Sequence, residues 1–120
     1  MNVYVVEDDK DIADMYRDYL SMVMGYEVTV IRTGTEAFDR FAHKSESPNA
    51  IVLDMHLPGK SGSEIYALME QRALANRILV CSADMDIVAR YSNMGATAIA
   101  KPVALKKLGE LVRGITGEVL

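Results

Sequence analysis

Apolar residues follow two different spacings along this chain. Short continuous runs are typical of strands buried in a sheet, whereas apolar residues that recur every three or four positions indicate helices with one buried face. The runs predict strands at 2–6, 27–31, 50–54, 77–82 and 97–100. The spaced segments predict helices at 10–24, 33–41, 61–69, 84–95 and 105–115. Because strand and helix alternate five times with short connections, we expect one α/β domain with a parallel sheet, helices on both faces and right-handed crossovers.

Local signals mark where the helices begin. Thr33 with Glu36, and Ser61 with Glu64, have the spacing of a capping box, and Asp84 is suited to cap the fourth helix. The apolar stripe of the first helix consists of Ile12, Met15, Tyr16, Tyr19, Leu20 and Val23. That of the fourth helix consists of Ile87, Val88, Tyr91 and Met94. These stripes are the faces expected to lie on the sheet.

Composition narrows the class of protein. The 120-residue chain is half apolar and a quarter charged, which suits a single soluble domain. Its net charge of −4 and its lack of a basic tract argue against direct binding to nucleic acid. Cys81 is the only cysteine, so no internal disulfide forms. Because no apolar run approaches the ~20 residues of a membrane span and no signal peptide opens the chain, we expect a cytoplasmic protein without membrane association.

Several polar side chains come directly after the predicted strands. All strands of a parallel sheet end at the same edge, so residues that follow different strands converge there, where ligands of α/β proteins bind. The residues placed at this edge are Glu7, Asp8, Asp54, Ser82 and Lys101. Taken singly, the acids could simply start a helix and the lysine could simply be solvated. Their shared edge with Asp54 instead favours a functional site.

The chemistry of these groups suits phosphoryl transfer. Clustered carboxylates raise one another's proton affinity unless a cation is near, and oxygen ligands of this kind suit Mg²⁺. Lys101 can hold an anionic group, and Ser82 can donate a hydrogen bond to it. Such a site can stabilise a phosphoryl group transferred onto Asp54, because this transfer depends on positioning and charge neutralisation.

The same residues carry a resemblance to the receiver domain of bacterial two-component response regulators. The matching segments are Val5-Val6-Glu7-Asp8, Val52 to Pro58, Gly62, Cys81-Ser82-Ala83 and Ala100-Lys101-Pro102. They span nearly the whole chain in the family's order. The resemblance implies a flavodoxin-like (βα)5 three-layer sandwich with strand order 2-1-3-4-5. It further implies a receiver domain at 1–116, with 117–120 as a C-terminal tail or the start of a linker.

The resemblance also implies a Mg²⁺ site. Asp8 and Asp54 would bind the ion directly, Glu7 would act on it through water, and the backbone carbonyl of His56 would complete the protein ligands. Asp9, the third consecutive acid, is expected only to start the first helix.

Asp54 would be the phosphoacceptor, Ser82 the switch hydroxyl and Lys101 the phosphoryl-binding lysine, presented by a cis peptide to Pro102. One hypothesis goes further: the side chains of His56 and Asp84 border the pocket and set how quickly phospho-Asp54 hydrolyses by controlling water access.

Two positions depart from the family's pattern. Ala98 stands where an aromatic residue is usual three residues before the lysine, and Val103 replaces a frequent phenylalanine after Lys101-Pro102. The usual aromatic readout is therefore missing. We still expect Ser82 and its loop to move, while the output surface and its coupling stay open.

The implied partners are a sensor histidine kinase or a histidine phosphotransfer protein. The output domain or downstream protein is not indicated, and a homodimer through the helix at 84–95, the strand at 97–100 and the last helix stays open. As a receiver, the domain would assist only its own phosphorylation and dephosphorylation.

The sequence fits other functions of similar sheet proteins less well. Gly59-Lys60-Ser61 would be part of a P-loop only with glycine at position 54, and an aspartyl-phosphate enzyme would need Asp at the position of His56. Acids occupy the place of an FMN phosphate loop, and no dinucleotide-binding glycine motif occurs. The closer alternative is a pseudo-receiver, an interaction module that works without phosphorylation. Ala98 favours it, but the acceptor, acids and lysine are all present.

Overall fold

Five parallel strands form the centre of the structure, a computed structural model that describes residues 1–43 and 45–117. The strands are β1 (Asn2–Val6), β2 (Glu27–Ile31), β3 (Ala50–Asp54), β4 (Ile78–Ser82) and β5 (Thr97–Ala100). Their order across the sheet is β2-β1-β3-β4-β5, as expected. The chain order therefore reverses at β1 and β3, which is where ligands of such sheets bind.

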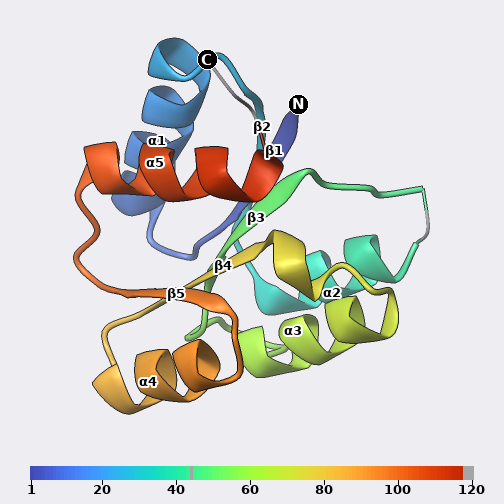
Figure 1. The fold of residues 1–120 in the computed structure, drawn as a ribbon. Coiled ribbons are helices and arrows are strands. Elements are labelled where there is room, and N and C mark those ends of the chain that lie inside the picture. The colour runs from blue at the N-terminus through green and yellow to red at the C-terminus, as the bar shows by residue number, and fades with distance from the viewer. Residues whose placement is uncertain (44, 118–120) are drawn as a thin grey trace.

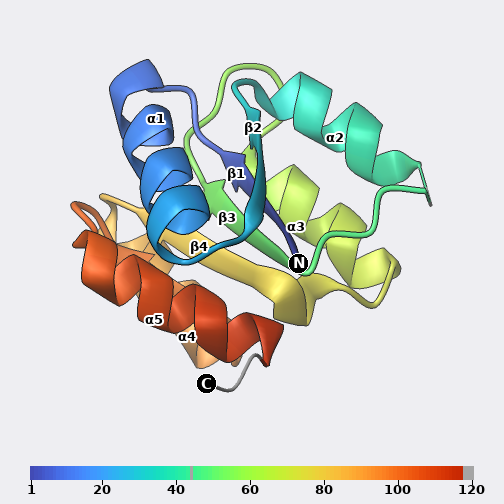
Figure 2. The same ribbon diagram turned by 90° about the horizontal axis from the view of Figure 1, so that it is seen from above.

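Helices cover both faces of the sheet (Figures 1 and 2). Helices α1 (Lys10–Asp18) and α5 (Leu105–Thr116) lie on one face. Helices α2 (Gly34–Ala42), α3 (Gly62–Gln71) and α4 (Met85–Asn93) lie on the other. The expected three-layer α/β fold is thus confirmed. Residues 118–120 of the expected tail lie outside the described part of the chain.

Side chains of strand β1 alternate between two apolar cores, one on each face of the sheet. Val3 and Val5 pack with α1 and α5, whereas Tyr4 and Val6 pack with α2, α3 and α4. Side chains of a strand alternate between its faces, so a continuous apolar run is needed when both faces are covered. This is why the central strands read as unbroken apolar segments.

The end of the first helix differs from the prediction. Residues Tyr19–Val23 form a π-helical turn, in which the Met24 amide donates to the Tyr19 carbonyl. The wider turn holds one more residue than an α-turn, so Met24 takes the core-facing position below Leu20. Val23, expected on the buried face, is 66% exposed as a result.

Two other apolar residues are more exposed than their spacing predicts. Met15 lies at the border of the apolar stripe of α1, and Met94 lies in the turn between α4 and β5; both are about half exposed. A short turn, η2 (Ala75–Arg77), also takes Arg77 out of the expected fourth strand. These differences affect segment ends and leave the topology unchanged.

The predicted N-cap residues accept their hydrogen bonds, but of the two predicted capping boxes the structure gives only the one at α3 as complete among the described residues. Thr33 and Asp84 accept hydrogen bonds from the first turns of α2 and α4, and Ser61 with Glu64 makes a complete capping box at α3. Asp9 caps α1 by accepting from the Ile12 amide at 3.0 Å. Among the described residues, no helix has the length and apolar content needed to cross a membrane.

Candidate functional site: an acidic cavity at the carboxyl edge of the sheet

Three carboxylates meet where β1 and β3 end. Glu7 and Asp8 follow β1, Asp54 is the last residue of β3, and one oxygen from each lies within 4.8 Å of the others. Glu7 and Asp54 are buried, at 2% and 5% exposure, whereas Asp8 is exposed. The pairing of β1 with β3 in parallel brings these residues together, as the sequence predicts.

The Lys101 ammonium reaches this group from the end of β5, the strand at one edge of the sheet. It donates to Glu7 Oε1 at 2.5 Å and lies 3.5 Å from Asp54 Oδ2. Lys101 follows β5, and its backbone amide donates to the Ser82 carbonyl at 2.9 Å, so the β4–β5 ladder places it. The Lys101–Pro102 peptide is cis, as the resemblance implies.

Burial and charge act in opposite directions on this pair. Burial raises the pKa of Glu7 to about 7, because desolvation and the neighbouring Asp54 charge outweigh the hydrogen bond from Lys101. Burial alone would lower the pKa of Lys101, but the carboxylates of Glu7 and Asp54 outweigh it, so the net shift is upward. A lysine that faces two carboxylates therefore keeps its charge.

Backbone amides orient the buried acids. The His56 amide donates to Asp54 Oδ1 at 3.1 Å, and the Asp9 amide donates to Glu7 Oε2 at 3.2 Å. These bonds hold the carboxylates in fixed positions and leave Asp54 with an oxygen on the Lys101 side.

A cavity of about 410 Å³ opens beside these groups. Its lining residues are Glu7, Asp8, Asp9, Ile12, Asp54, His56, Ala83 and Lys101. His56 therefore borders the cavity as expected. Asp84 is not among these lining residues, because its side chain turns away to cap α4 by accepting from the Asp86 amide at 2.9 Å.

Ser82 lies at the edge but is fully buried. Its hydroxyl accepts from the Asp84 amide at 3.0 Å, and the next residue, Ala83, lines the cavity in its place. The structure therefore brings Glu7, Asp8, Asp54, His56 and Lys101 to one cavity and leaves the Ser82 hydroxyl bonded within its own loop.

One residue at this edge was missed in the sequence. Arg32 follows β2, and its guanidinium donates twice to the Asp8 carbonyl, at 3.1 and 2.7 Å. It ties the loop that carries the acids to the neighbouring strand. The rule that residues after strands converge would have found it, had it been applied to β2 as well.

The donor set fits Mg²⁺. This ion takes oxygen ligands, binds through one or two carboxylates and retains several waters. Two buried carboxylates, one exposed carboxylate and an adjoining cavity meet that requirement.

Comparison with known proteins identifies the family. Residues 3–113 match the family described as the response regulator receiver domain. The chain belongs to this family. Receiver domains are signalling domains rather than classical enzymes.

A curated relative is the response regulator MprA of Mycobacterium avium (strain 104), which is 32% identical over 118 residues, 96% of this chain and 50% of that protein. The chain thus spans about half the length of the curated relatives it matches.

Two solved structures are similar to this receiver domain. One is a signal receiver domain of a putative LuxO repressor protein from Vibrio parahaemolyticus, with a TM-score of 0.83, 24% identity and coverage of 97% of this chain and 89% of that one. The other is a putative response regulator from Chloroflexus aurantiacus, with a TM-score of 0.82, 25% identity and 98% of both chains covered.

Proposed function

We propose that this receiver domain accepts a phosphoryl group on Asp54, in a Mg²⁺-dependent reaction, from a phosphohistidine of a sensor kinase or a histidine phosphotransfer protein. The observation that carries the proposal is the convergence of Lys101, Glu7 and Asp54 from β5, β1 and β3, next to the exposed Asp8. A surface acid without such a role would need neither a partly buried lysine nor a cavity.

The groups can be given roles. Asp8, Asp54 and the His56 carbonyl would hold Mg²⁺, with Glu7 acting through water, and the ion would offset charge on the phosphoryl oxygens. Lys101 is the chain's own cation for those oxygens. It is already held 3.5 Å from Asp54, so it needs only a short movement away from Glu7.

The transfer itself forms one bond and breaks one. An Asp54 carboxylate oxygen attacks phosphorus, the P–N bond of the phosphohistidine breaks, and its electron pair stays on the imidazole nitrogen. The Ser82 hydroxyl would then leave the Asp84 amide and donate to the new phosphoryl group. That rotation would draw the loop between β4 and α4 toward the site.

The signal would leave through the segments that follow this loop. We propose that phosphorylation shifts an equilibrium between two arrangements of α4, β5 and α5, which regulates an output domain or partner and can include a homodimer through these segments. Ala98, half-buried on β5, packs against the core under α2, α3 and α4 and offers no aromatic ring to move. Residues 1–116 form the receiver in this proposal, and 117–120 are a C-terminal tail or the start of a linker. The domain works in the cytoplasm and does not itself bind nucleic acid.

The test is chemical phosphorylation. The protein is incubated with acetyl phosphate or phosphoramidate, with Mg²⁺ or with EDTA, and its intact mass is measured. We expect a gain of one hydroxylamine-labile phosphoryl group only with Mg²⁺, and none in Asp54→Asn. An unchanged mass in folded wild-type protein would contradict the proposal and favour the phosphorylation-independent interaction module.

A further inference from the structure

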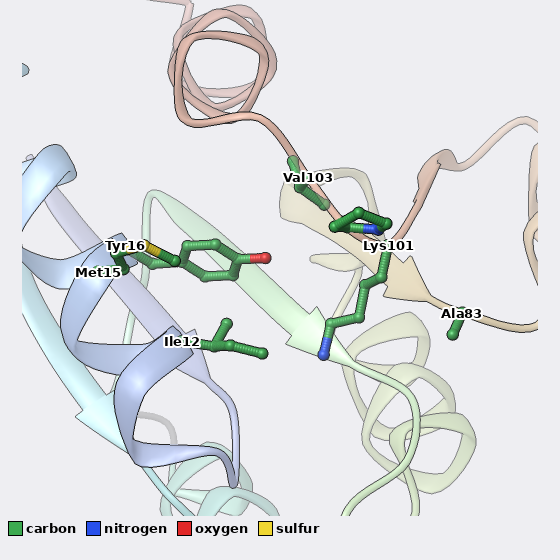
Figure 3. Close-up of a pocket in the computed structure, with 7 residues that line it drawn as sticks. Ile12, Met15, Tyr16, Ala83, Lys101 and Val103 are labelled. Carbon is green, nitrogen blue, oxygen red and sulfur yellow. The ribbon is translucent and has the colours of Figure 1, made fainter.

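A second cavity adjoins the acidic one and has a different character (Figure 3). It measures about 250 Å³ and lies between α1 and the segment that joins β5 to α5. Helix α1 contributes Ile12, Met15 and Tyr16, and the facing wall is Ala83 with residues 101–103. We call it the Tyr16 cavity. Apart from Lys101 and the Tyr16 hydroxyl, its lining side chains are apolar.

The Tyr16 ring is buried, at 3% exposure, and its hydroxyl points across the cavity toward the segment of Val103 (Figure 3). Among the described residues this hydroxyl has no hydrogen-bond partner, and solvent reaches it through the cavity. Burial raises the pKa of Tyr16 to about 12, so the phenol stays neutral and keeps its proton. A hydroxyl that opens into an apolar cavity can donate a hydrogen bond to an occupant that carries an acceptor.

Lys101 contributes its aliphatic stem to this wall, while its ammonium is paired with carboxylates of the acidic cavity. Figure 3 shows the side chain passing the Tyr16 hydroxyl, with its nitrogen near the end of β3, where Glu7 accepts a hydrogen bond from it and Asp54 pairs with it. Two carboxylates, those of Glu7 and Asp54, lie 2.5 and 3.5 Å from that ammonium and offset its charge, so the lining of the Tyr16 cavity offers no unpaired cation to an anion. A neutral occupant fits these surroundings.

The volume sets the size of the occupant. An engineered apolar cavity of about 150 Å³ holds benzene. At about 250 Å³, the Tyr16 cavity has room for a ring with a short substituent. The rim is open, because Met15 is half exposed and Ala83 and Pro102 are exposed.

We propose that the Tyr16 cavity is a binding site for a small neutral molecule with an apolar body and one hydrogen-bond acceptor, which the Tyr16 hydroxyl recognises. Because Lys101 and Ala83 form walls of both cavities, an occupant would constrain the lysine and the loop of the phosphoacceptor site. The site stands apart from the proposed phosphorylation, since binding requires neither Mg²⁺ nor a phosphoryl group.

The test uses acetophenone as the probe, with ethylbenzene as the matched molecule without an acceptor and benzoate as the matched anion. Each is titrated into metal-free, unphosphorylated protein, and chemical shifts are followed by NMR. We expect acetophenone to bind saturably, with a Kd on the order of 1 mM, and to shift signals of Ile12, Met15, Ala83 and Val103. Benzoate should bind more weakly.

Two variants test the Tyr16 hydroxyl and the space in the cavity separately. Tyr16→Phe should weaken acetophenone about fivefold, the loss of one neutral hydrogen bond, and leave ethylbenzene unchanged. Val103→Phe should fill the cavity and weaken both at least tenfold; Met15→Phe, at the exposed rim, replaces it if Val103→Phe does not fold.

Several results would overturn the proposal. These are shifts that do not saturate, shifts that lie elsewhere, equal affinity for benzoate, or equal affinity of acetophenone for wild-type protein and Tyr16→Phe. The free protein is also measured at two concentrations. If the signals of the Tyr16 cavity move with protein concentration, a second copy fills it, and the small-molecule assignment is wrong.

Discussion

Lys101 lies between two carboxylates that would otherwise face each other in a buried place. Its ammonium is 2.5 Å from Glu7 and 3.5 Å from Asp54, so one cation partly neutralises both. Removing one partner of a buried ion pair is costly, because the remaining charge is left without compensation. The residue that would bind the phosphoryl group thus also stabilises the site before any phosphoryl group arrives.

Substitutions of His56 and Asp84 distinguish an effect on water access to phospho-Asp54 from an effect on the stability of α4. His56 borders the acidic cavity, whereas Asp84 caps α4 and does not line the cavity. We expect His56→Ala to admit water and shorten the lifetime of phospho-Asp54 severalfold. Asp84→Ala should change that lifetime less and lower the free energy of unfolding by about 1 kcal/mol through loss of the cap.

The measurement is the decay of the phosphorylated protein by intact mass, alongside urea unfolding. Equal lifetimes of wild-type protein and His56→Ala would remove His56 from the control of hydrolysis. A larger change in Asp84→Ala than in His56→Ala would mean that the loop after β4 controls water access instead.

At the scale of elements, the connection between β3 and α3 is held by close backbone contacts. The Gly62 amide donates to the Met55 carbonyl at 3.3 Å, and the Gly34 amide at the start of α2 donates to the Pro58 carbonyl at 3.0 Å. A Cβ at Gly62 would lie 2.6 Å from Met55 Cα and 2.9 Å from the Asp54 carbonyl oxygen. Glycine is therefore required where this helix begins beside the acceptor strand.

Gly62→Ala should accordingly destabilise the protein, by about 1–3 kcal/mol, because backbone atoms must move to make room. Gly114→Ala is the matched control: Gly114 lies within α5, and among the described residues a Cβ there meets no atom within 4 Å outside the backbone of its own helix. That change should raise the free energy of unfolding by about 0.5–1 kcal/mol through helix propensity. Urea unfolding of the three proteins measures both, and a Gly62→Ala protein as stable as wild type would show that the connection is adaptable.

In the molecule as a whole, an apolar core packs on each face of the sheet, and the charged groups of the site lie at its carboxyl edge. Helices cover both faces of the sheet. The charged residues at the carboxyl ends of the strands are not covered in this way, and they line the acidic cavity. Burial of the Glu7 carboxyl away from water, and its repulsion by the Asp54 charge, both oppose folding. A bound divalent cation would relieve that repulsion and stabilise the whole domain.

The stability of the metal-free protein should therefore depend on pH through Glu7. Its pKa is raised from 4.5 to about 7 in the folded state, so the folded state binds this proton more tightly than the unfolded state does. Its contribution is fully present below about pH 4.5 and is lost as the pH rises through about 7. In EDTA, we expect this group to lower the free energy of unfolding by roughly 1–3 kcal/mol between pH 4.5 and pH 8.

Glu7→Gln isolates this contribution, because glutamine keeps the size of the side chain but has no carboxyl group that can titrate. Urea unfolding from pH 4.5 to pH 8 should show a smaller loss in Glu7→Gln than in wild-type protein, and Mg²⁺ at pH 8 should stabilise wild-type protein. Identical pH dependence in both proteins would show that Glu7 does not titrate in this range.

The local sequence pattern determines the helices, the strands and the caps of this protein. The apolar runs, the stripes of the helices and the caps at Thr33, Ser61 and Asp84 act over a few residues, so they can be read from neighbouring positions. Parallel topology then places Glu7, Asp8, Asp54 and Lys101 at one edge, since parallel strands end on the same side.

The contacts among these groups depend on the packing of the whole chain and cannot be read from neighbouring positions. The bond between Lys101 and Glu7 joins residues 94 positions apart, and its length depends on the packing of every strand between them. The same holds for the Ser82 hydroxyl, which is bonded within its loop, and for the Tyr16 cavity between α1 and residues 101–103. The π-helical turn that exposes Val23 likewise depends on fitting α1 to the sheet, because a helical periodicity alone predicts a regular turn.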